Sequence, residues 1–128
     1  MTVATLRSAL SNSERVSYSE PMDLSSDDAC NEDACPVARA VDVLDGRWTM
    51  LVIRDLLRGT RRFSELRASL VGISPKTLTD RLRSLEQHGL VQRVMYAEIP
   101  PRVEYSLTER GRALKPVLDA LATWGATV

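Results

Sequence analysis

The chain has 128 residues, of which 44% are hydrophobic and 27% are charged, and its formal net charge at pH 7 is zero. This length predicts one small domain with a modest core. The sequence has no run of 18 apolar residues, which excludes a membrane-spanning helix. Its first residues lack the basic start and apolar stretch of a secretion signal. We therefore expect a cytoplasmic protein.

Charge is unevenly distributed along the sequence. Residues 1–34 carry two arginines and seven acidic residues, whereas residues 35–128 carry fifteen Arg or Lys and ten acidic residues. The first segment is rich in Ser and Asp, so we expect a flexible acidic extension at 1–34 and one basic folded domain at 35–128. A basic domain is suited to bind the phosphates of DNA. An alternative role for the acidic segment is to compete with DNA for the basic face of the domain. The spacing of Val3, Leu6 and Leu10 also leaves open a short amphipathic turn that docks on a partner subunit.

Two helices are expected before residue 60. The first runs from Pro36 to Leu44, and the second runs from Trp48 to Leu57 after a turn that contains Gly46. The second helix has a broad apolar face, which predicts deep burial. The members of this face are Trp48, Leu51, Val52 and Leu56.

A helix-turn-helix is expected next. A short amphipathic helix from Arg62 to Leu70 is followed by a linker and by a strongly capped second helix. Ser74 is a good N-cap, and Pro75 suits the first helical position, where a missing N–H costs nothing. Gly89 suits the left-handed residue that ends such a helix. Three leucines at i, i+4 and i+7 predict its buried stripe: Leu78, Leu82 and Leu85.

The face opposite this stripe carries small hydroxyls and cations, which a DNA major groove accepts, so we interpret the second helix as a recognition helix. Lys76 and Arg83 are the leading candidates for contacts with bases or phosphates. Asp80 has two open roles: it accepts a hydrogen bond from cytosine, or it pairs with one of these cations a turn away. The candidate DNA-binding residues of this segment are Ser74, Pro75, Lys76, Thr77, Thr79, Asp80 and Arg83.

A hairpin and a last helix complete the expected elements. Residues 90–96 and 102–107 are β-rich on either side of a proline-containing turn, which is typical of a β-hairpin. Thr108 is the expected N-cap of a helix that runs to about Thr123 and is kinked or locally loosened at Pro116. The predicted fold class is therefore mainly α with a small β-hairpin, a winged helix-turn-helix. Further candidate DNA contacts are Arg61 and Arg62, before the first helix of the helix-turn-helix, and Arg102, at the wing.

Several short motifs follow one another in a collinear order between residues 35 and 125. They are Cys35-Pro36-Val37, Gly46-Arg47-Trp48, Arg62-Phe63-Ser64-Glu65-Leu66, Gly72-Ile73-Ser74, Leu82-Arg83-Ser84-Leu85-Glu86, Gly89-Leu90-Val91, Pro101-Arg102-Val103-Glu104-Tyr105-Ser106-Leu107-Thr108 and Trp124-Gly125. In this order and spacing the chain resembles the HxlR-type regulators, a branch of the MarR-like winged-helix transcription factors. The resemblance implies a homodimer that pairs through its first and last helices, and hence an inverted-repeat DNA operator.

The sequence has two cysteines, Cys30 and Cys35. Cys35 immediately precedes Pro36 at a helix start, where backbone N–H groups and the helix dipole favour the reactive thiolate. HxlR-type regulators often carry a cysteine here, and their thiol-responsive members sense oxidants, quinones or aldehydes with it. The resemblance therefore implies redox sensing by Cys35, with Cys30 as a resolving partner or a spare thiol. Acidic neighbours such as Glu32 and Asp33 disfavour the thiolate, and two inert cysteines remain an open alternative.

No enzyme, cofactor or metal is expected. The sequence shows no Ser–His–acid set and no phosphate-cradling glycine loop, and two cysteines with the distant His88 do not make a zinc site. We expect a DNA-binding repressor that responds to thiol modification at Cys35. Two alternatives stay open: a regulator that responds to a small non-covalent ligand, and a winged-helix module that binds protein. The expected partners are double-stranded DNA, a second copy of the chain and a small-molecule or electrophile inducer.

Overall fold

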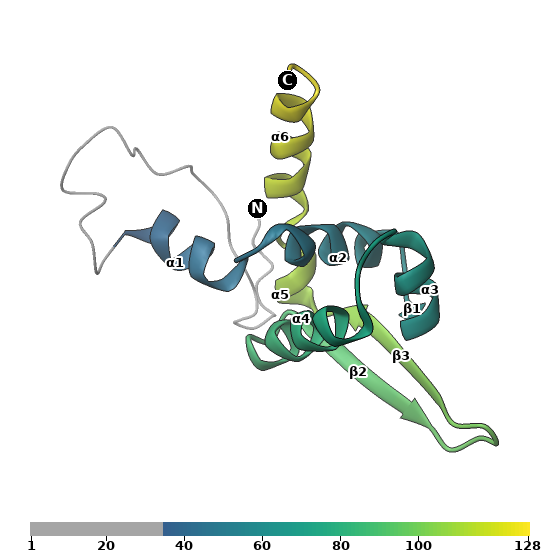
Figure 1. Cartoon of the computed structure of the whole chain (residues 1–128). Helices are drawn as coiled ribbons and strands as arrows, with labels where there is room; N and C mark the ends of the chain where they lie inside the picture. Colours follow the sequence, from purple (N-terminus) through teal and green to yellow (C-terminus); the bar gives the residue numbers. More distant parts are fainter. Residues whose placement is uncertain (1–34) are drawn as a thin grey trace. The chain divides into compact units, whose positions relative to one another are not determined.

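The computed structural model describes residues 35–128 (Figure 1). The chain divides between Asp45 and Gly46 into two units, and the first is described only from residue 35. The expectations for residues 1–34, including those for Cys30 and for the acidic extension, lie outside the described residues.

The first unit contributes one helix, α1 (Pro36–Val43), which ends one residue before its expected end. Cys35 is its N-cap residue, and Pro36 takes a first-turn position where the absent N–H has no helical partner to lose. Val37 and Val41, one turn apart, are 45% and 57% exposed, and no residue of α1 is buried. Within the described part of the chain, the apolar side of α1 that carries Val37 and Val41 is therefore exposed.

The second unit is built on three helices, α2 (Arg47–Leu57), α3 (Phe63–Ser69) and α4 (Pro75–Gln87). α2 packs against both α3 and α4 (Figure 1). The turn between α3 and α4 places Gly72 at a φ of 95°, a conformation that side chains disfavour. The predicted helix-turn-helix is therefore confirmed, with α4 as its second helix.

The core of this unit is aliphatic. Val52, Ile53 and Leu56 of α2 are at most 4% exposed. Trp48 and Leu51, which we expected to be deeply buried beside them, are only half-buried, and Leu51 lines a groove between α2 and α6. The other buried apolar side chains of this unit are Leu66, Leu70, Ile73, Leu78, Leu82, Leu85, Leu90, Val91 and Leu107.

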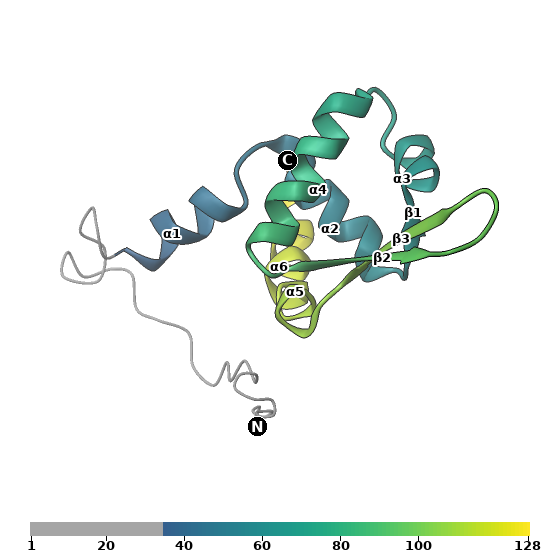
Figure 2. The same ribbon diagram turned by 90° about the horizontal axis from the view of Figure 1, so that it is seen from below.

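A three-stranded antiparallel sheet completes the winged helix-turn-helix (Figure 2). Its strands are β1 (Arg61–Arg62), β2 (Val91–Tyr96) and β3 (Arg102–Leu107), in the order β1-β3-β2. β2 and β3 form the predicted hairpin, but the prediction of two strands missed β1. A strand of two residues is too short to show the alternation that identifies strands in a sequence.

The last helix that we predicted is divided into two, α5 (Glu109–Arg112) and α6 (Lys115–Gly125), so the prediction of a single helix is wrong, and the interruption lies just before Pro116. Thr108 caps α5 as expected, since its hydroxyl accepts a hydrogen bond of 3.1 Å from the Gly111 N–H. Pro116 lies in the first turn of α6, where its missing N–H breaks no helical hydrogen bond. The proline therefore begins a new helix and does not kink an existing one.

α6 leaves its apolar side chains uncovered. None of its residues is buried, and Val117, Leu121 and Trp124 are 40%, 43% and 68% exposed. A groove of about 630 Å³ lies between α2 and α6, and Met50 and Leu118 are among its apolar lining residues. Among the described residues, no helix is long and apolar enough to cross a membrane.

Candidate nucleic-acid interface

The two ends of α4 are specified by local hydrogen bonds. Ser74 is extended, and its Oγ accepts a hydrogen bond of 3.0 Å from the Thr77 N–H. The Ser74 hydroxyl also donates to Thr77 Oγ1 at 2.9 Å, and Pro75 follows as the first helical residue. At the other end His88 is the C-cap residue, and Gly89 has a φ of 75°. The predicted start and stop of α4 are both confirmed.

α4 separates an apolar face from a polar one. Leu78, Leu82 and Leu85 are buried, and α4 packs against α2 and β2. Lys76 and Arg83 are exposed on the other side, where they are joined by half-buried polar residues: Thr77, Thr79 and Asp80. α4 therefore brings the candidate residues of the recognition helix together on one accessible surface.

Asp80 is paired with Lys76. The Lys76 Nζ donates to Asp80 Oδ2 at 2.9 Å across one helical turn. This hydrogen bond is the main reason why the pKa of Asp80 lies below its usual value of 3.8. Partial desolvation of the carboxyl opposes the shift, and the charges of Lys76, Arg81 and Arg83 add to it. Of the two roles left open for Asp80, the pairing role is the one seen in the structure.

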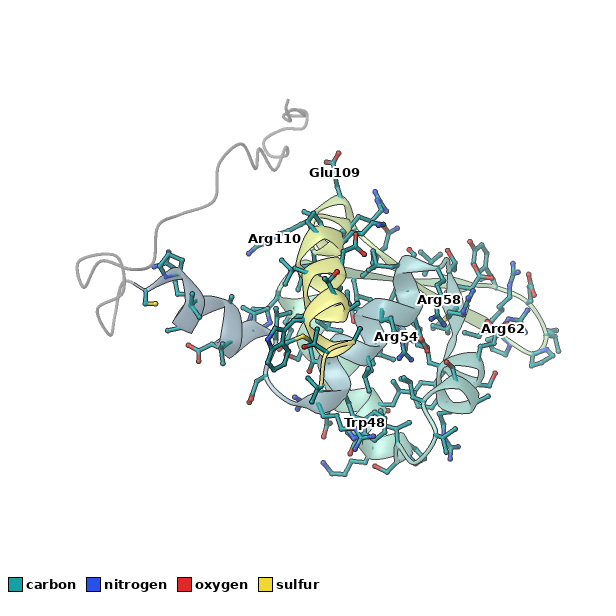
Figure 3. The ribbon with its side chains drawn as sticks, turned by 90° about the horizontal axis from the view of Figure 1, so that it is seen from above. Trp48, Arg54, Arg58, Arg62, Glu109 and Arg110 are labelled. Carbon is teal, nitrogen blue, oxygen red and sulfur yellow. The ribbon has the colours of Figure 1, made fainter. Side chains whose placement is uncertain are left out.

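Arg61 and Arg62 form β1 at the edge of the sheet farthest from β2. Neighbouring residues of a strand point to opposite faces of a sheet, so the side chains of these two arginines project from opposite faces. The Arg61 guanidinium donates to the Thr60 carbonyl at 3.1 Å, whereas Arg62 is exposed beside the hairpin (Figure 3). The pairing register sets Arg61 opposite Tyr105.

Arg102 is held inside the wing. Its guanidinium lies 4.1 Å from the centre of the Tyr96 ring and forms ion pairs of 2.9 Å with Glu98 and 3.3 Å with Glu104. Its side chain is only 28% exposed. Arg102 thus braces the tip of the hairpin, a structural role that adds to the DNA contact predicted for it.

Two residues that the sequence reasoning missed, Arg93 and Tyr105, lie beside α4. They are cross-strand partners on β2 and β3, and cross-strand partners point to the same face of a sheet. Together with Thr79, Arg83 and neighbouring α4 side chains they line a groove of about 320 Å³. The available signal was strand alternation, since Arg93 lies two residues after the buried Val91 and therefore on the same face.

Cys35 caps α1 as predicted and is 3% exposed. Its sulfur is in a disulfide in this structure. The other cysteine of the sequence, Cys30, lies outside the described residues. Within residues 35–128, no three His, Cys, Asp or Glu side chains are grouped so that they could hold a metal ion.

The sequence model of the HxlR-like helix-turn-helix family matches residues 43–128, which contain every helix and strand of the second unit. The chain belongs to the HxlR family. It is therefore a transcriptional regulator with a winged helix-turn-helix DNA-binding fold, as the motifs in its sequence implied.

Individual relatives agree with this assignment. An uncharacterised HTH-type transcriptional regulator of Synechocystis is 54% identical over 92 residues, which are 72% of this chain and 68% of the relative. A MarR-family transcriptional regulator from Porphyromonas gingivalis has a TM-score of 0.73 and 39% identity, and the match covers 76% of this chain and 95% of that one. The redox regulator HypR in its oxidised form has a TM-score of 0.70 and 40% identity, with coverages of 73% and 97%.

Proposed function

We propose that this regulator is a homodimeric repressor that binds an inverted-repeat operator through α4 of each subunit. The observation that carries the proposal is the polar face of α4, where Lys76 and Arg83 are exposed above a helix anchored by three buried leucines. Arg and Lys can pair with the O6 and N7 of guanine in the major groove or with backbone phosphates. The proposed DNA contacts are Arg61, Arg62, Ser74, Pro75, Lys76, Thr77, Thr79, Asp80, Arg83 and Arg102.

Apolar surface on the first and last helices supports the dimer. Val37 and Val41 of α1 are exposed, as are Leu121 and Trp124 of α6. Exposed apolar side chains at helical spacing are typical of an interaction surface, and most soluble homo-oligomers are twofold dimers. Two α4 helices related by a twofold axis would enter successive major grooves about 34 Å apart, which is why the operator is proposed to be an inverted repeat.

We further propose that oxidation of Cys35 controls DNA affinity. Two features support this: the position of Cys35 at the start of α1, and its capacity to form a disulfide. Loss of two electrons and two protons from two thiols forms the disulfide, and an oxidant such as diamide accepts them. A structural relative, HypR, is a redox regulator solved in its oxidised form. In the proposed mechanism the change at Cys35 shifts the dimer helices and alters the spacing of the two α4 helices.

The test is a DNA-binding titration of reduced and diamide-treated protein. The probe is a duplex from the intergenic DNA upstream of the gene, at two salt concentrations, because phosphate contacts make affinity salt-dependent. We expect the reduced protein to bind and the oxidised protein to release the duplex. Cys35→Ser should bind as the reduced protein does and resist diamide, while a non-reducing gel of Cys30→Ser reports whether Cys30 supplies the partner sulfur. Release that persists in Cys35→Ser contradicts the thiol mechanism, and salt-independent or absent binding contradicts DNA recognition at this promoter.

The α2–α6 groove favours a second candidate trigger, a small non-covalent ligand. Its volume of about 630 Å³ lies in the range of small-molecule sites, and Leu51, Leu118 and Leu121 give it an apolar lining. This candidate predicts DNA binding that diamide leaves unchanged. It also predicts that Leu118→Trp, which fills the groove, alters DNA release by an inducer and leaves DNA binding itself intact.

A further inference from the structure

The groove between α4 and the sheet, here named the α4–wing groove, is a polar hollow of about 320 Å³. Its walls come from consecutive turns of α4 on one side and from β2 and β3 on the other. Its lining residues are Thr79, Leu82, Arg83, Glu86, Arg93 and Tyr105. Leu82 is 2% exposed, so it anchors this part of α4 in the core while its polar neighbours remain accessible.

The two arginines of this groove differ from the cations of the unit that are held in ion pairs. Arg54 and Arg58, both labelled in Figure 3, form ion pairs with Asp55, and Arg102 forms ion pairs with two glutamates. Within the described residues, neither Arg83 nor Arg93 has an ion-pair partner, and both are exposed. Both guanidiniums therefore keep their N–H donors available for a ligand.

The chemistry of the lining selects an anion with several acceptor oxygens. Two guanidiniums and the Glu86 carboxylate give the groove a net charge of +1, which matches the single negative charge of a phosphodiester. Guanidinium groups bind phosphate oxygens in a bidentate manner, and the hydroxyls of Thr79 and Tyr105 add donors beside them. The Arg93–Tyr105 pair is held in register by the sheet, so this wall is formed before the ligand arrives.

We propose that the α4–wing groove binds one phosphodiester of the DNA backbone, with Arg93 and Arg83 as its cationic ligands and Thr79 and Tyr105 as neutral donors. This inference rests on the DNA recognition proposed above and adds to it a positioning site that reads no base. Phosphate contacts determine the register of a protein on a duplex, while base contacts determine sequence. The groove thus sets the depth at which α4 enters the major groove.

The first experiment compares Arg93→Gln with Arg110→Gln, which removes the same charge from an exposed residue on α5 outside the groove (Figure 3). Affinity is measured for the upstream duplex and for a scrambled duplex of equal length across a salt series. Arg93→Gln should weaken binding to both duplexes by about tenfold. It should also reduce the slope of log K against log salt by about 0.9, the value for one phosphate. Arg93→Lys should retain the slope, and Arg110→Gln should resemble the wild type.

The second experiment identifies the phosphate itself. Single neutral methylphosphonate linkages are placed along the upstream duplex, and each duplex is titrated with wild type and with Arg93→Gln. One linkage in each half-site should weaken wild-type binding as much as the mutation does. At that linkage Arg93→Gln should cause no further loss, whereas at all others the two effects should multiply. Multiplied losses at every linkage would overturn the proposal.

Substitution of Glu86 should change DNA affinity in the opposite direction. Its carboxylate lines the same groove and repels a phosphate, so Glu86→Gln should strengthen binding to both duplexes by several-fold. Gln87→Ala, the exposed neighbour outside the groove, should leave affinity unchanged.

The outcomes separate this inference from the proposed function. A wild-type protein that binds neither duplex in a salt-dependent way contradicts DNA recognition altogether. A wild type that binds, with Arg93→Gln indistinguishable from Arg110→Gln, overturns only the phosphate site. Arg93→Gln that weakens the upstream duplex and leaves the scrambled one unchanged would make Arg93 a base reader, which also overturns it. Circular dichroism and the Tm of each variant confirm that its fold is intact.

Discussion

α4 and α6 are both amphipathic helices with a proline in the first turn, but they use their apolar faces differently. α4 buries Leu78, Leu82 and Leu85 inside its own unit, whereas α6 buries none of its residues. Leu121 and Trp124 remain exposed on α6. The comparison teaches that an amphipathic pattern predicts a helix with a contact face but does not predict whether that contact lies within the chain or with a partner.

The largest expected difference separates Leu82→Ala from Leu121→Ala. Leu82 is fully enclosed, so its truncation should lower the free energy of unfolding by about 2–5 kcal/mol at any protein concentration. Leu121 is 43% exposed in the single chain, so its truncation should act through subunit association. Urea unfolding at two protein concentrations measures the free energy of unfolding of both variants, and sedimentation measures their association. A concentration-independent loss for Leu121→Ala as large as that for Leu82→Ala would break the comparison.

A smaller effect is expected at the start of α4. Ser74→Ala removes the acceptor for the Thr77 N–H and should lower the free energy of unfolding by about 1 kcal/mol. Ser74→Asp restores an acceptor and should retain the stability of the wild type. Equal unfolding midpoints for Ser74→Ala and Ser74→Asp would show that the cap hydrogen bond is not stabilising.

The smallest effect is expected for the Lys76–Asp80 pair on the polar face. Because folding lowers the pKa of Asp80 below 3.8, its stabilising contribution is present above that value and is lost as the pH falls through the lower folded-state pKa. The wild type should therefore exceed Asp80→Asn in Tm at about pH 6, and the two should converge in acid. High salt should also reduce the difference, because the pair is exposed. A Tm difference that persists unchanged into acid would assign the effect of the substitution to something other than the ion pair.

Local signals explain which elements the sequence predicted well. The bounds of α4 follow from Ser74, Pro75 and Gly89, three residues whose preferences are set by backbone geometry. Other elements depend on distant parts of the chain. β1 exists because residues 61–62 lie against β3, and the break at residues 113–114 follows a short helix, α5, that packs against β3. Neither the pairing of β1 nor the break before α6 gives a recognisable residue pattern in its own stretch of sequence.

The candidate site divides in the same way. Lys76 and Arg83 could be assigned from one helix, because helical periodicity places both opposite the leucine stripe. Strand alternation places Arg93 on the same face as Val91, but its proximity to α4 could not be predicted because it depends on how the sheet packs against the helix. Arg102 looked available in the sequence, but three separate side chains of the wing engage it. Charge alone therefore could not distinguish a bracing arginine from an unpaired one.

The strand order β1-β3-β2 also has a consequence for protein synthesis. β3 lies between the other two strands although it is the last of the three to be translated. Until residues 102–107 leave the ribosome, neither β1 nor β2 has its neighbour in the sheet. A nascent chain that ends before residue 102 therefore carries a complete α4 but no wing, and in such a truncated product the side of α4 that packs against β2 would have no formed sheet beside it and would be open to chaperones and proteases.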